Sequence, residues 1–277
     1  MSIKIVTDST CDLPPSVIEQ YGIAVIPLYI NVGKESYLDG VDLSREAFYQ
    51  QLPTYETHPT TAAAGSGLFQ QHYERAAEEG ATEVLSIHIA SSLSATLDVA
   101  RLAAKQTTSV PVTAFDSKQL SLGTGFLVEQ AAKAAAEGRS MNEIVALLEE
   151  QISRTYVFAM LDTLEYLRRS GRMNSVLASF ATWLKIKPIL KMYQGDATSE
   201  RVRTSKKATK RLINLLTDAA PLEKVALLHT NAPQKAAALR QQVEHLLPEQ
   251  EIMSVNITPV IGAHIGPGAV GFACLSR

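Results

Sequence analysis

Polar side chains follow three predicted strands of the chain, in each case at the point where the strand ends. An Asp-Ser-Thr sequence occupies residues 8–10, a Ser-Ser pair residues 91–92 and an Asp-Ser pair residues 116–117. In an open parallel sheet, ligands bind outside the carboxyl ends of the strands, where such side chains meet. Their hydroxyl groups and the nearby backbone N–H groups suit one small acidic group. The sequence therefore predicts an anion-binding site at this edge of a sheet.

The Ser91-Ser92 pair also stands at the start of a predicted helix over residues 93–106. Free N–H groups and the positive end of the helix dipole favour an anion there. Serines commonly cap helices without binding a ligand, so Ser92 or Ser94 taken alone indicates a cap. The coincidence with two other strand ends supports a binding role as well.

Residues 53–66 are predicted to form a loop, because they show no periodicity and contain Pro53, Pro59 and Gly65. Loops of this length are often functional, and a Thr-Thr pair that ends at Thr61 places two more hydroxyl groups here. Threonine also serves in purely local turns, so Thr61 is a candidate only together with the strand ends.

Three arginines surround one glycine in the sequence Arg-Arg-Ser-Gly-Arg at residues 168–172. Basic side chains often cap the C-terminal end of a helix. The planar donor group of an arginine also binds an acidic ligand or an acidic partner residue. Both roles stay open for Arg172.

The stretch at residues 261–268 combines three glycines, one proline and one histidine. With Gly271 it matches the GxGxxG pattern literally. A dinucleotide site is rejected because Pro267 interrupts the pattern and no helix can follow. The glycines instead predict a loop over residues 262–268 whose backbone passes close to another group. His264 is the one titratable side chain in this loop and is therefore a candidate polar contact.

Six basic residues without an intervening acidic residue lie between positions 201 and 211. A helix predicted over residues 206–216 places four of them on one face. Such a face is usually only solvated. In a chain of net charge −2 its local concentration indicates a docking surface for an acidic partner or an anionic lipid surface. The cluster consists of Arg201, Arg203, Lys206, Lys207, Lys210 and Arg211.

The composition excludes several classes of protein. Of 277 residues, 46% are hydrophobic and 19% are charged, which supports a substantial core rather than a disordered chain. The small net charge gives no general attraction to nucleic acid. Cys11 and Cys274 stand alone, which excludes a disulfide framework and a zinc ribbon, and no metal site is expected. Because neither a signal peptide nor a membrane span is recognisable, a soluble cytoplasmic protein is expected.

Strands alternate with helices through the first 155 residues, which predicts a parallel sheet covered on both faces. The order then changes, and the predicted elements are a mostly helical stretch at 164–190, a hairpin at 189–204, the basic helix, and strands at 224–229, 251–258 and 269–275. The sequence therefore predicts an α/β protein of two domains. They are an N-terminal parallel-sheet, Rossmann-like domain at residues 1–155 and a C-terminal mixed-sheet α/β domain at residues 156–277.

Seven short motifs occur together in the chain, and their combination and order resemble those of the DegV family of bacterial fatty-acid-binding proteins. The resemblance covers essentially the whole chain. The motifs are Asp-Ser-Thr-Cys-Asp-Leu at 8–13, Pro-Thr-Thr at 59–61, Ser-Ser-Leu-Ser-Ala-Thr at 91–96, Tyr-Leu-Arg-Arg-Ser-Gly-Arg at 166–172, Leu-Lys-Ile-Lys-Pro-Ile at 184–189, Arg-Val-Arg-Thr at 201–204 and Gly-Ala-His-Ile-Gly-Pro-Gly at 262–268.

The resemblance implies a DegV-like fold with one long-chain fatty acid between and inside the two domains, and no cofactor. It implies that Thr61 and Ser92 hold the carboxylate. It also implies a carrier without catalytic activity, which presents the acid to a fatty acid kinase for acyl-phosphate formation. Five residues of the basic cluster would then dock that kinase or a membrane surface, namely Arg201, Arg203, Lys206, Lys207 and Lys210. A secondary polar network around the carboxylate would comprise Ser9, Ser91, Ser94, Arg172 and His264.

The chain departs from the family motifs at Ala95, at Ser170 and in the three alanines at 62–64, and Ala95 adds a methyl group where the family usually has glycine. The alternative function is a serine hydrolase or thioesterase. In that enzyme Ser92 would be the nucleophile, His264 the general base and Asp116 the third member of the triad. Almost any chain offers such a trio, so the pattern alone is a weak signal.

Overall fold

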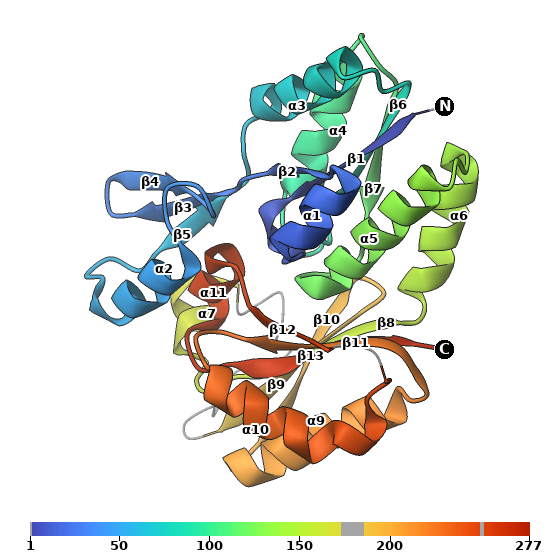
Figure 1. Cartoon of the computed structure of the whole chain (residues 1–277). Helices are drawn as coiled ribbons and strands as arrows, with labels where there is room; N and C mark the ends of the chain where they lie inside the picture. The colour runs from blue at the N-terminus through green and yellow to red at the C-terminus, as the bar shows by residue number, and fades with distance from the viewer. Residues whose placement is uncertain (1, 173–185, 250–251) are drawn as a thin grey trace.

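The N-terminal part of the molecule is built on a four-stranded parallel sheet (Figure 1). The computed structural model describes residues 2–172, 186–249 and 252–277. The strand order is β2-β1-β6-β7, so the first strand lies inside the sheet. The strands are β1 (Ile3–Asp8), β2 (Ala24–Ile26), β6 (Glu83–His88) and β7 (Val112–Asp116).

Helices cover both faces of this sheet. Successive side chains of a strand point to opposite sides, so apolar neighbours on one strand pack against different helices. On β1, Val6 packs with α3 (Ser66–Glu78) and α4 (Thr96–Gln106). Its neighbour Ile5 packs on the other face with the alanine-rich α5 (Leu122–Ala136). The remaining helices here are a short 3₁₀ turn at Ser9–Cys11, α1 (Pro15–Tyr21) and α6 (Met141–Ile152).

A small antiparallel sheet, ordered β4-β3-β5, is inserted between β2 and β6. It corrects one prediction, since the loop expected at 53–66 contains a strand. A strand of only three residues is too short to show a period in the sequence. The insert comprises β3 (Tyr29–Val32), β4 (Glu35–Leu38), α2 (Arg45–Gln51), a 3₁₀ turn at Leu52–Thr54 and β5 (Thr60–Ala62).

The C-terminal part contains a six-stranded mixed sheet ordered β10-β9-β8-β13-β11-β12. Among its described strands, only β11 and β12 pair in parallel. One face packs on α9 (Ser205–Asp218) and α10 (Pro233–Val243), and the other faces the N-terminal domain. The strands are β8 (Thr155–Met160), β9 (Lys187–Tyr193), β10 (Asp196–Val202), β11 (Leu222–His229), β12 (Met253–Asn256) and β13 (Val270–Ser276), and a 3₁₀ turn spans Glu244–Leu246.

The predicted glycine loop at 262–268 is wrong in its first half, which forms the helix α11 (Pro259–Ile265). Thr258 caps this helix, accepting a hydrogen bond from the N–H of Val260, and Pro259 is well suited to the first turn. Gly262 lies within this helix. The position requires a glycine because a side chain there would collide with Tyr49. The glycine therefore serves helix packing and not a loop.

Within the described residues, the helical stretch predicted over 164–190 is confirmed for α7 (Glu165–Arg169). Its last residues are wrong, since β9 begins at Lys187. The part of this prediction at 173–185 lies outside the described residues. The two-domain α/β fold is confirmed, and the boundary between residues 155 and 156 stays a prediction. Within the described ranges, no helix has both the length and the hydropathy of a transmembrane span.

Candidate functional site

A cavity of about 350 Å³ lies between the two domains, in the size range of ligand sites in proteins. Both sheets and the inserted lobe contribute to its wall, which is mostly apolar. The larger apolar side chains are Leu28, Ile89, Leu93, Leu120, Val157, Leu167, Leu190, Met192, Leu228, Ile257, Val260, Ile261 and Ile265. A few polar residues also line it, namely Thr10, Thr61, Ser94, Ser121, Arg172, Lys191 and His264.

Thr61 and His264 meet at this cavity although 203 positions separate them in the chain. The Thr61 Oγ1 and His264 Nε2 atoms lie 2.9 Å apart. Thr61 is positioned by β5, where it pairs with Ile30, and His264 by α11. When Nε2–H donates to the threonine oxygen, the threonine hydroxyl proton is free for an acceptor in the cavity. The pair is thus suited to a carboxylate oxygen.

His264 is held in its neutral form by its surroundings. Burial lowers the pKa of His264 to about 4, and the nearby Arg172 and His58 act in the same direction. Its Nδ1 atom is buried and has no hydrogen-bond partner within the described part of the chain. Buried polar atoms are nearly always paired, so this atom indicates room for a further polar group.

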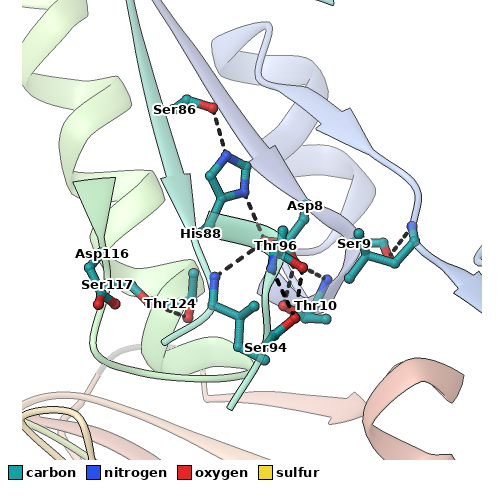
Figure 2. A network of polar contacts seen from close by, with 12 residues as sticks. Asp8, Ser9, Thr10, Ser86, His88, Ser94, Thr96, Asp116, Ser117 and Thr124 are labelled. Atoms are coloured by element: carbon teal, nitrogen blue, oxygen red, sulfur yellow. Dashed lines mark hydrogen bonds and ion pairs between the residues drawn. The ribbon is translucent and has the colours of Figure 1, made fainter. Parts of the chain in front are cut away.

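Two more residues with hydroxyl groups line the cavity near the carboxyl ends of the parallel strands. They are Thr10, which follows β1 and whose hydroxyl donates to Asp8, and Ser94, which follows β6. Figure 2 shows both near these strand ends. The Ser94 Oγ lies 2.8 Å from the Thr96 hydroxyl and accepts a bond of 3.2 Å from the Thr96 N–H. These contacts fix the serine at the start of α4.

A buried network behind Thr10 fixes its position (Figure 2). Asp8 accepts hydrogen bonds from the Thr10 N–H at 3.0 Å and from the Ile89 N–H at 3.2 Å, and its Oδ2 lies 2.9 Å from His88 Nδ1. His88 Nε2 continues to Ser86 at 2.6 Å. Burial alone would raise the pKa of Asp8, but the bonds from His88 and Thr10 outweigh it and lower this pKa. The residues of this network are buried, and of its polar side chains only Thr10 lines the cavity, so the network supports the cavity wall.

A second buried cluster, which sequence reasoning missed, ties α11 to the N-terminal domain. Asp12 accepts bonds from the Thr258 N–H at 2.9 Å and the Ser121 hydroxyl at 2.6 Å, and Arg45 lies 3.0 Å from the same carboxylate. Asp39 accepts a bond from the Thr258 hydroxyl. Burial raises the pKa of Asp12 to about 6, although Arg45 favours the charged form. The only sequence signal was an aspartate shortly after the first strand.

Three serines of the predicted site lie elsewhere. The exposed Ser92 hydroxyl donates a bond of 2.7 Å to the carbonyl of Gly195, and Ser91 donates to Asp116 at 2.6 Å. The Ser9 hydroxyl accepts from the Leu28 N–H at 3.3 Å. None of the three is among the cavity-lining residues. The sequence shows hydroxyls at both 92 and 94, and only the turn after β6 decides which faces the cavity.

The catalytic trio of the alternative function is not joined by hydrogen bonds among the described contacts. Ser92 bonds to Gly195, Asp116 to Ser91, and His264 to Thr61. This arrangement does not present the Ser92 hydroxyl to a general base.

The basic cluster lies on β10 and the first turns of α9. Arg201, Arg203, Lys206, Lys207 and Lys210 are exposed. Arg211 is half-buried, and its side chain pairs with Glu200 at 2.7 Å and with Asp218 at 3.6 Å. From the cavity-lining Ala197 to Arg201, an extended strand spans about 13 Å. The cations are therefore close to the cavity in the chain but do not line it.

The sequence matches one family model over residues 2–277, and this model is described as an uncharacterised protein of the DegV family. The chain belongs to the DegV family. A DegV domain-containing protein of Streptomyces coelicolor is 35% identical, with 99% of both chains covered. The protein DegV of Bacillus subtilis is 33% identical, with 98% of both chains covered.

Solved DegV structures share the fold of this chain. One neighbour is a DegV family protein of Thermus thermophilus, described for its fatty acid binding, with a TM-score of 0.91 and 33% identity. Another is DegV of Bacillus subtilis, described as a fatty acid binding protein, with a TM-score of 0.91 and 32% identity. Each comparison covers 100% of both chains. The fold and the family predicted from the sequence are both confirmed.

Proposed function

We propose that this DegV protein binds one long-chain fatty acid in the cavity between its domains. The observation that carries the proposal is an apolar cavity whose wall holds the Thr61–His264 pair, 2.9 Å apart, together with Ser94 and Arg172. This is the composition that a long apolar tail with one acidic group requires. The fatty-acid-binding relatives of the same fold support it.

The carboxylate would accept hydrogen bonds from the hydroxyls of Thr61 and Ser94. Ser94 replaces Ser92 in this assignment, because Ser94 lines the cavity and Ser92 does not. The exposed guanidinium of Arg172, at the cavity wall, would add a favourable charge. With Nε2 protonated, the unpartnered Nδ1 of His264 is an acceptor, so it would gain a partner through a water molecule that bridges it to the carboxylate.

The acyl tail would supply most of the affinity. Burying one methylene group is worth about 0.8 kcal/mol, so a tail of about twelve methylenes contributes roughly 10 kcal/mol before the costs of association. The carboxylate contacts then need only fix the orientation of the acid. Neutral hydroxyls do this without enclosing the group in ion pairs.

We further propose that the protein delivers the acid to a fatty acid kinase and is not itself an enzyme. The exposed cations Arg203, Lys206, Lys207 and Lys210, with Arg201, suit a kinase of acidic surface or transient contact with an anionic membrane. Exposed charges of this kind act mainly on association rate and salt dependence. No nucleic acid partner is proposed.

Mass spectrometry of the purified protein tests the proposal. Under native conditions we expect one free fatty acid bound per chain, and after denaturation the unmodified mass of the chain. An acylated Ser92, or steady hydrolysis of an acyl thioester that is lost on changing Ser92 or His264, would instead establish the hydrolase. A protein that carries no lipid and binds none when offered would contradict the carrier.

A further inference from the structure

The helix α11, which carries His264, belongs in sequence to the C-terminal domain but lies against the inserted lobe of β3, β4, α2 and β5 (Figure 1). Its Val260 and Ala263 are part of the apolar cluster of that lobe. Thr61 belongs to the same lobe, on β5. The contact of 2.9 Å between Thr61 and His264 therefore depends on how α11 is held against the lobe.

Two buried carboxylates of the N-terminal domain hold the start of α11. The N–H of Thr258, which caps the helix, donates a bond of 2.9 Å to Asp12, and the Thr258 hydroxyl donates to Asp39. Tyr49 adds a bond of 2.9 Å from its hydroxyl to the carbonyl of Ile257. Buried donors that lose their acceptors cost free energy, so these bonds resist a shift of the helix.

Asp12 is itself fixed on several sides. Its carboxylate accepts a bond of 2.6 Å from the Ser121 hydroxyl and lies 3.0 Å from the Arg45 guanidinium. Asp12 and Ser121 both have a positive φ, of 56° and 51°. Few residues other than glycine adopt such a backbone, and it persists where the surroundings hold it, often at functional sites. Ser121 also lines the cavity, so the contacts from Ser121 through Asp12 to Thr258 join the cavity wall to α11.

The negative charge of Asp12 strengthens its bond to Thr258, since hydrogen bonds to an ionised acceptor are stronger than those between neutral groups. Burial raises the pKa of Asp12 to about 6, and burial raises the pKa of Asp39 as well. The guanidinium of Arg45 acts to lower both pKa values. Asp12 is therefore charged at pH 8.

We propose that Asp12 and Asp39 are positioning residues of the headgroup site. By holding Thr258 they keep α11 in place, and α11 keeps His264 in contact with Thr61. The inference rests on the proposed function. A hydrogen bond depends narrowly on distance and angle, so a small shift of α11 is enough to weaken this contact. Thr61 would then direct its hydroxyl proton less well to the carboxylate, while the apolar wall would still bury the tail.

The affinities for palmitate and for methyl palmitate test the inference, with delipidated protein at pH 8. The two ligands share one tail, but the neutral ester forms weaker hydrogen bonds than the carboxylate. Asp12→Asn keeps the size of the side chain and suits the left-handed backbone, but removes the charge and one acceptor oxygen. We expect the Kd for palmitate to rise about three- to tenfold, as for one ordinary hydrogen bond, and the Kd for methyl palmitate to change by less than about twofold.

Nuclear magnetic resonance of histidine, isotope-labelled at the ring nitrogens, gives a second readout in the protein without ligand. The parent should carry the His264 proton on Nε2, which donates to Thr61. In Asp12→Asn we expect a mixture of the two ring tautomers, because the hydrogen bond that selects one of them is weakened.

Glu129→Gln is the matched control. Glu129 is also a buried carboxylate between the domains, paired with Lys224 of β11, but it does not line the cavity. The variant should keep the parent's ratio of the two affinities. A second pair of variants changes the cap residue. Thr258→Val loses the hydroxyl that donates to Asp39 and should behave like Asp12→Asn, whereas Thr258→Ser keeps it and should behave like the parent.

Equal losses of affinity for palmitate and methyl palmitate in Asp12→Asn would show a role in stability alone and would overturn the inference. A parent-like affinity for palmitate in both Asp12→Asn and Thr258→Val would overturn it as well. A parent protein that binds neither ligand would instead refute the proposed function, and the tautomer of His264 would still test how α11 is held.

Discussion

Replacing Thr61 by valine removes one hydroxyl group from the cavity wall and keeps the shape of the side chain. The change deletes the contact of 2.9 Å with His264, which is left with both ring nitrogens unpaired in the wall. A hydrogen bond to a charged group contributes about 1.5–3 kcal/mol. Since about 1.4 kcal/mol corresponds to tenfold in affinity, we expect the Kd for a fatty acid to rise about tenfold to 150-fold.

Thr60→Val provides the control for this experiment. Thr60 is the neighbouring residue of β5, is exposed, and points to the opposite face of the strand, since successive side chains alternate. Titration of the delipidated proteins with a fatty acid, followed by calorimetry, gives the two constants. Equal affinities for Thr61→Val and Thr60→Val would refute the placement of the carboxylate at Thr61.

Three other changes test separate aspects of the account. Ser94→Ala should weaken fatty-acid binding by about 1.5–3 kcal/mol in the same titration. An unchanged Kd would contradict the assignment of Ser94 as a donor to the carboxylate. The double change Arg203→Glu and Lys207→Glu should leave fatty-acid binding intact but slow acyl-phosphate formation by a cognate kinase, most strongly at low salt. A rate equal to that of the parent at every salt concentration would contradict the docking surface. His264 has its pKa lowered from 6.5 to about 4 in the folded chain, so the unfolded chain takes up its proton first and stability falls as the pH drops through this window. His264→Gln should therefore lose less stability than the parent between pH 6.5 and 4 in urea unfolding, and parallel curves would contradict this.

The strand ends of the N-terminal sheet could be predicted because their signals are local. A β-branched run followed by hydroxyl residues indicates a strand that ends in a polar site, and Thr10 indeed lines the cavity. Parallel sheets place such ends together whatever the details of the loops. The hairpin predicted at 189–204 depends on local signals in the same way, and it is confirmed as β9 and β10.

The residues that were misread depend on contacts distant in the sequence. Gly262 reads as a loop residue until Tyr49 is seen packed against it. Asp12 is one residue of a short motif in the sequence, and only the structure brings Arg45 and Thr258 to its carboxylate. Ser92 and its bond to Gly195 join positions 103 residues apart, and no local pattern announces such a pair.

The central claim is that a fatty-acid carboxylate lies at Thr61 and His264. Nuclear magnetic resonance of palmitate, isotope-labelled at the carboxyl carbon, observes that group directly when it is bound to the delipidated protein. We expect one bound carboxyl signal, distinct from that of free palmitate, which shifts in Thr61→Val and in His264→Gln but not in Thr60→Val. Saturable binding with a carboxyl signal that is the same in the parent and in all three variants would contradict the claim.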